Sequence, residues 1–180
     1  MASELKAGRD LHLRPLRLRD AGELFLLVEA NRPRLRRWLP WLDDNRSKAD
    51  TRTYIRHRRN LEGQHLALTF GLWWKGKLVG LAGFNWIDHA NRSAAIGYWL
   101  GQDAEGHGLM TRAVAALLQH GFRTLDLNRI ELRAGVRNRR SRAVAERLGF
   151  RHEGTLRKAE RLYERFVDHA VYGLLVEEWR

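Results

Sequence analysis

Apolar and polar residues alternate with two different periods along this chain, and the changes of period mark its strands and helices. Residues 11–18 alternate at every second position, which predicts a first strand, and Pro15 favours an edge or a bulge for it. A helical stripe follows, with Asp20 as a candidate N-cap. We expect that helix to end before Pro33, because the residue ahead of a proline disfavours the helical backbone.

The middle of the chain predicts three strands in succession. Residues 32–47 are irregular, aromatic and basic, and residues 48–60 predict a second helix. Apolar strands over 65–74 and 78–87 flank a short glycine-containing turn, as in a hairpin, and a third strand covers 93–100. Strands joined by turns this short pair in antiparallel fashion.

The helix over 110–122 has the clearest periodicity in the sequence, because its apolar residues recur at i, i+3, i+4 and i+7 through three turns. A strand over 129–136, a helix over 138–149 and two strands over 150–162 and 166–179 complete the chain. This last part therefore alternates helices with strands.

The order of these elements predicts a mixed α/β sheet. The strand–helix–strand unit over 96–136 calls for a right-handed parallel crossover, whereas the hairpins before and after it pair in antiparallel fashion. The chain has 180 residues, of which 44% are hydrophobic, and seven Trp, which is enough for one domain with a real core. It contains no repeat or linker at which a second domain would begin.

Composition narrows the class of protein further. Cys is absent, which excludes disulfides, thiolate zinc sites and a cysteine nucleophile and suits a reducing cytosol. No apolar run approaches the roughly 18 residues of a membrane span, and the first residues lack the apolar block of a signal peptide, so we expect a cytoplasmic protein without a membrane partner. The 33 Lys and Arg against 21 Asp and Glu give a net charge of +12, which indicates either an anionic partner or a solvated basic surface.

A glycine segment with the sequence EGHGLM, residues 105–110, stands between a predicted strand and a predicted helix. Backbone N–H groups at the helix start and the missing Cβ atoms of Gly106 and Gly108 suit a phosphate, but a loop that needs glycines only for its turns has the same sequence. The segment is neither a Walker loop nor a dinucleotide G-x-G-x-x-G motif. His107 has no second His at metal-ligand spacing and reads as a solvent-facing loop residue.

A second helix start, at Asn138 and Ser141, follows the next strand, so that two helix N-termini lie at one edge of the sheet. One cleft between them is compatible with this arrangement. An ordinary N-cap at Asn138 with Ser141 in the first turn explains the pair equally well without a ligand.

Several segments, in order, resemble the GCN5-related N-acetyltransferases (GNAT), and among them the ribosomal-protein alanine/serine acetyltransferase group. The resemblance spans nearly the whole chain. It rests on LRPLRLRDAGELF, RRWLPWLD, LVGLAGFNWID, IGYWLGQDAEGHGLMTRAV, NRIELRAGVRNRRSRAVAERLGFRHEGTLRKAE and YERFVDHAVYGLLVEEW. It implies a single N-acetyltransferase domain over residues 1–180 with an α/β fold, in which a mixed and mostly antiparallel sheet with a parallel splayed strand pair is flanked by helices.

The resemblance also implies a site for acetyl-CoA in the V between strands 94–101 and 129–136. Backbone N–H groups of the loop and helix start would bind its pyrophosphate, with the His107 side chain a bystander. These residues are Gly106, His107, Gly108, Leu109, Met110 and Thr111. The pantetheine would pair with backbone at Tyr98, Trp99 and Leu100 and bond Asn138. The family usually carries Gln or Arg where this chain has Glu105, which we expect to point away from the phosphates.

For the chemistry, the resemblance implies Glu160 as general base and Ser141 as the acid that protonates the departing thiolate, with no metal. The alternative for Glu160 is a strand-surface carboxylate paired with Arg157 or Arg161. Trp38 and Trp41, in an irregular connection, are expected to line the acceptor mouth, although aromatic residues at such spacing also occur in cores.

The resulting hypothesis is an enzyme that transfers acetyl from acetyl-CoA to a primary amine by direct attack in a ternary complex. The expected acceptor is the N-terminal amine of an acidic ribosomal protein, because a chain of charge +12 attracts acidic partners and repels polyamines. A small-molecule amine or antibiotic acetyltransferase is one alternative, and a non-catalytic ribosome- or RNA-binding module is another. The resemblance also suggests a homodimer, with nucleic acid only as the context of the ribosome.

Overall fold

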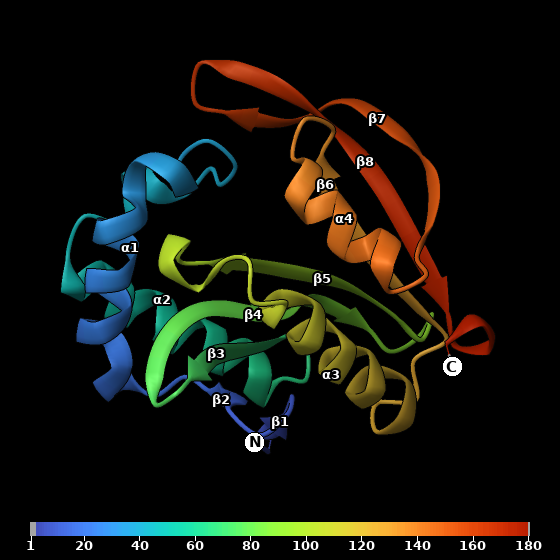
Figure 1. Cartoon of the computed structure of the whole chain (residues 1–180), viewed down its shortest axis with the longest axis horizontal. Coiled ribbons are helices and arrows are strands. Elements are labelled where there is room, and N and C mark those ends of the chain that lie inside the picture. The colour runs from blue at the N-terminus through green and yellow to red at the C-terminus, as the bar shows by residue number, and fades with distance from the viewer. Residues whose placement is uncertain (1–2, 180) are drawn as a thin grey trace.

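The sheet that dominates the fold has eight strands, and the computed structural model describes residues 3–179 of the chain (Figure 1). Its strand order is β1-β2-β3-β4-β5-β6-β8-β7. The strands are β1 (Leu5–Lys6), β2 (Leu11–Pro15), β3 (Leu68–Trp74), β4 (Lys77–Asp88), β5 (Ser93–Leu100), β6 (Arg129–Gly135), β7 (Arg151–Leu162) and β8 (Arg165–Leu175). The helices are α1 (Ala21–Leu35), α2 (Lys48–Gly63), α3 (Leu109–Arg123) and α4 (Arg139–Arg147), with 3₁₀ turns η1 (Leu18–Asp20), η2 (Leu42–Asp44), η3 (Gln102–Ala104) and η4 (Val176–Glu178).

The predicted mixed sheet is confirmed, and its one parallel pair is β5 with β6 among the strands described. Ser93 to Ile96 pair with Arg129 to Leu132, and the pairing stops there although both strands continue. Figure 1 shows β6, β8 and β7 diverging from β5 beyond this point. The chain thus opens a V between Leu100 and Gly135, the last residues of the two strands.

Each face of the sheet has its own core. One face packs against α3 and α4, and the stripe read from the sequence is buried there, with Ala113, Val114 and Leu117 fully inaccessible. The other face packs against α1 and α2 and includes Trp99. Because side chains alternate along a strand, Tyr98 points to the α3–α4 side and its neighbour Trp99 to the α1–α2 side. A ligand in the V therefore contacts residues from both cores.

The expected end of α1 before Pro33 is wrong, because the helix continues to Leu35. Leu35 is buried, and the backbone N–H of Arg36 donates to the carbonyl oxygen of Arg32 at 2.9 Å, so the helical turns resume after the proline. Packing of the last turn therefore compensates for the one N–H that the proline lacks. The additional turn carries Arg34, which the site uses.

The cap predicted at Asp20 is also wrong in its contacts. Asp20 precedes α1, but its carboxylate accepts from the backbone N–H of Arg17 at 2.7 Å and from Arg14 at 3.2 Å, and makes no cap bond to the helix. Outside the predicted elements, β1 adds a short edge strand, and the final strand ends at Leu175 rather than at 179.

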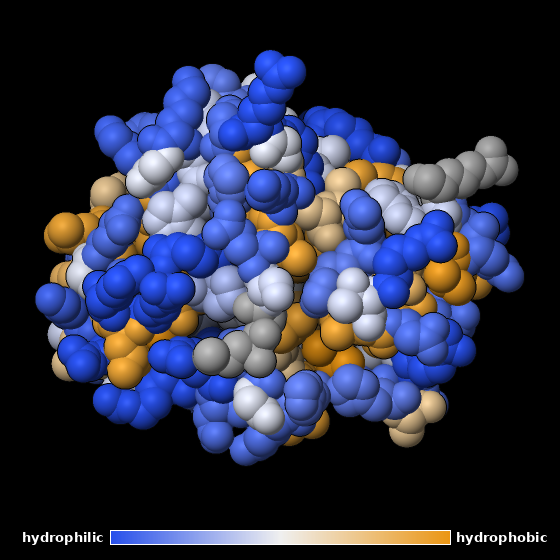
Figure 2. Space-filling model, turned by 90° about the horizontal axis from the view of Figure 1, so that it is seen from below, coloured by the Kyte–Doolittle hydropathy of each residue, from blue (hydrophilic) through white to orange (hydrophobic). Residues whose placement is uncertain are grey.

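The face of the molecule seen from below is mostly polar. Figure 2 shows hydrophilic side chains over most of the face seen from below, with hydrophobic ones visible between them. No helix within residues 3–179 is long and apolar enough to cross a membrane.

Candidate active site

At two positions in the loop between β5 and α3, the backbone has a conformation that only glycine adopts without strain. Gly106 and Gly108 have φ angles of +81° and +69°, in the left-handed region. A Cβ at either position would meet nothing within 4 Å, so the glycines meet a backbone requirement on an open face of the loop. At the loop's start, the N–H of Gly101 donates to the carbonyl oxygen of Val79 at 2.7 Å and holds the loop to β4.

The start of α3 presents free hydrogen-bond donors. Within residues 3–179, no protein acceptor binds the backbone N–H groups of residues 106–111, and Gly108 at the N-cap has no side chain to satisfy them. A helix of 15 residues adds the positive end of its dipole at this place. The residues present therefore fit a pyrophosphate, which accepts hydrogen bonds from several N–H groups at once.

Glu105, the acid beside this anion site, is neutralised by two arginines. Arg34 from α1 and Arg140 from α4 each donate to one of its carboxylate oxygens, and Arg34 also donates to the carbonyl oxygen of Leu100. The side chains of Arg34 and Glu105 are each 25% exposed, whereas that of Arg140 is 79% exposed. Glu105 thus links α1, the end of β5 and α4, through one largely buried arginine and one exposed arginine.

The side chain of His107 packs against β3. Its ring centroid lies 4.8 Å from that of Trp74, whose Nε1–H donates to Asp10 at 2.7 Å. The exposed imidazole is therefore part of an aromatic contact at the back of the loop, consistent with the bystander role predicted for it.

Where β5 has already parted from β6, a hydrogen-bonded pair joins β5 to α4. The Tyr98 hydroxyl donates to the backbone oxygen of Ser141 at 2.9 Å and accepts from Ser141 Oγ at 3.1 Å. Asn138 caps α4 by accepting from the backbone N–H of Ser141 at 3.3 Å, as the cap reading predicted. Burial raises the pKa of Tyr98 to about 12, so the phenol keeps its proton at neutral pH. Sequence reasoning missed this side chain, because 43 positions separate it from Ser141 and no local pattern joins them.

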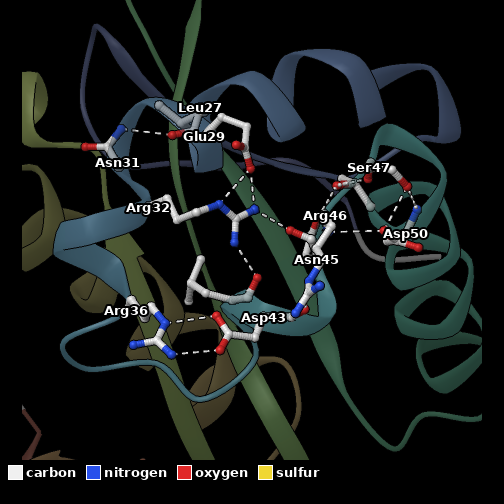
Figure 3. A network of polar contacts seen from close by, with 12 residues as sticks. Leu27, Glu29, Asn31, Arg32, Arg36, Asp43, Asn45, Arg46, Ser47 and Asp50 are labelled. Atoms are coloured by element: carbon white, nitrogen blue, oxygen red, sulfur yellow. Dashed lines mark hydrogen bonds and ion pairs between the residues drawn. The ribbon is translucent and has the colours of Figure 1, made fainter. Parts of the chain in front are cut away.

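On the opposite face, two arginines fix the irregular segment 36–47: Arg32 of α1, and Arg36, which follows the helix and begins the segment (Figure 3). Arg32 donates to the backbone oxygens of Leu42 and Asn45. Arg36 makes two hydrogen bonds to Asp43, at 2.9 and 2.7 Å. These contacts give an ordered backbone to a segment that has little regular secondary structure.

Trp38 and Trp41, both in this segment, lie on the two sides of the V. Trp38 stands over Gly135 at the end of β6, 3.5 Å from where a Cβ of that glycine would be. Trp41 packs against Trp99 of β5, with ring centroids 6.4 Å apart. A cavity of about 20 Å³ adjoins this second pair and is also lined by Tyr54. The two tryptophans predicted from the sequence therefore flank the open ends of the diverging strands on the α1–α2 face.

Glu160 projects from β7 toward the same face. A register shift between Leu156 and Glu160 places three residues in a bulge, and Glu160 then lies opposite Val167. Its Oε2 atom is 3.4 Å from Nε2 of His169 on β8, and its side chain is 30% exposed. Among residues 3–179, neither Arg157 nor Arg161 pairs with it, so its partner differs from both alternatives read from the sequence.

The tip of the β7–β8 hairpin closes over the segment 36–47. The Tyr163 hydroxyl donates to the carbonyl oxygen of Leu39 at 2.6 Å and accepts from the N–H of Leu42 at 3.3 Å. The guanidinium of Arg36 lies 3.6 Å from the centroid of the Tyr163 ring. The hairpin and the segment together therefore enclose the acceptor side of the V.

Comparison with known proteins relates this geometry to characterised chains. Residues 10–151 match the acetyltransferase (GNAT) domain family. The putative ribosomal N-acetyltransferase YdaF of Bacillus subtilis (strain 168) is 36% identical over 176 residues, which cover 97% of this chain and 96% of that protein.

Two solved structures superpose over nearly the whole length. RimL, a ribosomal L7/L12 alpha-N-protein acetyltransferase in complex with coenzyme A, has a TM-score of 0.94 and 28% identity and covers 98% of this chain and 99% of its own. The microcin C7 self immunity acetyltransferase MccE, in complex with acetyl-CoA and AMP, has a TM-score of 0.92 and 32% identity and covers 94% of both chains.

Proposed function

This chain belongs to the GNAT family of acetyltransferases, with acetyl-CoA as cosubstrate, and we propose that its acceptor is the N-terminal amine of an acidic ribosomal protein. The observation that carries the proposal is the charge around the acceptor side of the V, described below. Cytoplasmic location and assembly as a homodimer belong to the same proposal.

The cosubstrate side uses backbone groups. The N–H groups of residues 106–111 would hold the pyrophosphate, and the backbone of Tyr98 to Leu100, unpaired toward β6, would hold the pantetheine as an added strand. Asn138, at the start of α4, would bond the same arm. When bound, acetyl-CoA supplies an acetyl group activated as a thioester.

The proton transfers fall to two side chains. An α-amine has a pKa near 8, so only about a tenth of it is neutral at pH 7. Glu160 takes the proton of the ammonium, directly or through one water, and so exposes the nucleophile. A backbone N–H near Tyr98 to Leu100 stabilises the developing oxyanion. The Ser141 hydroxyl would give its proton to the departing thiolate and take one back from solvent. The Tyr98 phenol keeps Ser141 in place by the two hydrogen bonds between them.

The acceptor side carries exposed cations without carboxylate partners. Within residues 3–179, no Asp or Glu pairs with the exposed basic side chains of the hairpin and the neighbouring segment. These are Arg37, Arg157, Lys158 and Arg165. Unpaired cations favour an acidic partner and steer it by long-range attraction, which salt screens over about 8 Å at physiological ionic strength.

Peptide kinetics test the acceptor. A peptide with a free N-terminus followed by Asp and Glu should be acetylated with a kcat/KM at least about tenfold above that of its Asn and Gln counterpart, a preference that shrinks between about 50 and 300 mM salt. Blocking the N-terminus is the matched control and should abolish acetylation. Equal rates for both peptides, or faster acetylation of small amines or of nucleotide-linked amines, would contradict the proposed acceptor.

Two further measurements separate enzyme from binding module. Isothermal titration should show acetyl-CoA binding, and its absence at hundreds of micromolar would contradict the family assignment of function. Glu160→Gln should lower kcat by about 100-fold or more while leaving acetyl-CoA affinity within about twofold, because the carboxylate acts on the amine. An unchanged kcat removes Glu160 as the base.

A further inference from the structure

A histidine stands directly behind the proposed base. His169 of β8 lies opposite Gly135 of β6, and residues directly opposed in an antiparallel pair point to the same face. Trp38 covers Gly135 on that face. Glu160 pairs with Val167, two residues from His169, and so points the same way. The imidazole is therefore held between the acceptor wall and the carboxylate.

The surroundings leave Glu160 as its polar contact. Nε2 of His169 is 3.4 Å from Oε2 of Glu160, and the histidine side chain is only 16% exposed. Among residues 3–179, Glu160 is the one carboxylate that forms an ion pair with His169. Other charged side chains share this face of the neighbouring strands. Among them are Arg133 of β6, whose Nε donates to Glu131 at 2.6 Å, and Arg165 of β8, which donates to the backbone of Arg37 at 3.1 Å.

A carboxylate alone is a weak acceptor for the proton of an ammonium group. An imidazole nitrogen is a stronger base than a carboxylate and is therefore the better final acceptor for this proton. The bulge after Leu156 brings Glu160 back within reach of the imidazole, which a regular register would not do. The geometry thus offers an exit for the proton.

We propose that His169 is a positioning residue that receives, through Glu160, the proton taken from the acceptor amine. The N–H bond of the ammonium breaks and a carboxyl O–H forms at Glu160. That O–H then breaks as Nε2 of His169 takes the proton, and the resulting imidazolium releases a proton to solvent before the next turnover. This inference rests on the proposed role of Glu160.

Imidazole rescue provides the test. His169→Ala should lower kcat with the peptide acceptor by about 10- to 100-fold, with acetyl-CoA affinity by titration within about twofold of wild type, and millimolar imidazole should restore at least about a tenth of the lost rate. His152→Ala is the matched control. That residue lies on the same hairpin with its ring against Tyr172, on the opposite face, and its loss should change kcat by less than about twofold without any imidazole effect.

The outcomes separate the two claims. A wild-type kcat in His169→Ala overturns the relay, and loss of kcat without imidazole rescue assigns His169 a structural role and overturns it as well. If Glu160→Gln is fully active while His169→Ala is slow and rescued, the base proposed above is wrong and His169 accepts the proton directly, which also contradicts a relay. Only slow Glu160→Gln together with a slow, rescued His169→Ala supports it. The thermal unfolding transition of each variant shows whether it is folded under the assay conditions.

Discussion

Replacing Glu105 with Gln removes a negative charge from the loop proposed to bind the pyrophosphate, and we expect it to tighten the binding of coenzyme A. In the wild-type protein the carboxylate occupies Arg34 and Arg140 and also repels the incoming phosphates. Gln is one of the residue types that the family motif usually carries at this position. The variant keeps the size of the side chain and can still accept a hydrogen bond from Arg34.

The size of the effect follows from charge and exposure. Two unit charges about 8 Å apart in water interact by about 0.5 kcal/mol, so repulsion of the two charges of a pyrophosphate amounts to about 1 kcal/mol. Arg140 is 79% exposed, and separating an exposed pair costs less than about 1 kcal/mol. The released guanidinium can then turn to the cofactor. We expect coenzyme A to bind about 3- to 10-fold more tightly to Glu105→Gln, with a steeper loss of affinity in salt.

Isothermal titration of coenzyme A at low and high salt measures this effect. Glu177→Gln is the matched control, because it removes the same charge from an exposed position beyond the far end of β8 and should leave the affinity unchanged. Titration of 3′-dephospho-coenzyme A shows which phosphate gains from the released arginine. Unchanged or weaker binding in Glu105→Gln would refute the idea that Glu105 competes with the cofactor for these arginines.

Three further predictions concern the frame of the site. Arg32→Gln should raise the acceptor KM about tenfold or more, because segment 36–47 loses the two hydrogen bonds from Arg32, and should leave coenzyme A affinity unchanged. The exposed control Arg123→Gln should change neither the acceptor KM nor the coenzyme A affinity. Because the pKa of Tyr98 is raised to about 12, the stability linked to its protonated phenol is fully present below about pH 10 and is lost as the pH rises toward 12. In urea unfolding over that interval, the free energy of unfolding of the wild type should fall by about 2–3 kcal/mol relative to that of Tyr98→Phe. Parallel pH profiles of the two proteins would contradict this. Gly108→Ala should lower the unfolding free energy by about 1–2 kcal/mol because φ is +69°, while Gly63→Ala in α2 should not lower it.

The part of the fold that sequence patterns predicted correctly depends on local order. Helix α3 follows from its apolar stripe, β5 from its apolar run, and the cap at Asn138 from the residue type alone. Each of these features is decided within a few residues. The end of α1 was predicted wrongly because burial of Leu35, a tertiary effect, outweighs the local preference of Pro33.

The parts of the site that patterns did not reveal depend on contacts between distant segments. Glu105 and Arg34 are 71 positions apart, and Glu105 and Arg140 are 35 apart. The bulge that brings Glu160 to His169 depends on strand register. Alternation of polar and apolar residues fixes the face to which a side chain points, but a shift of the register by two residues leaves that face unchanged. The resemblance to a family supplied the proposed site residues, but the partners of each residue required the fold.

The most direct test of the account is the identity of the acetylated molecule. The protein is incubated with labelled acetyl-CoA, ribosomes and a cell lysate, and the labelled species is identified by mass spectrometry with fragment ions that locate the acetyl group. The account predicts label on the α-amine of an acidic ribosomal protein, lost with Glu160→Gln. Label confined to small amines or to lysine side chains would contradict it.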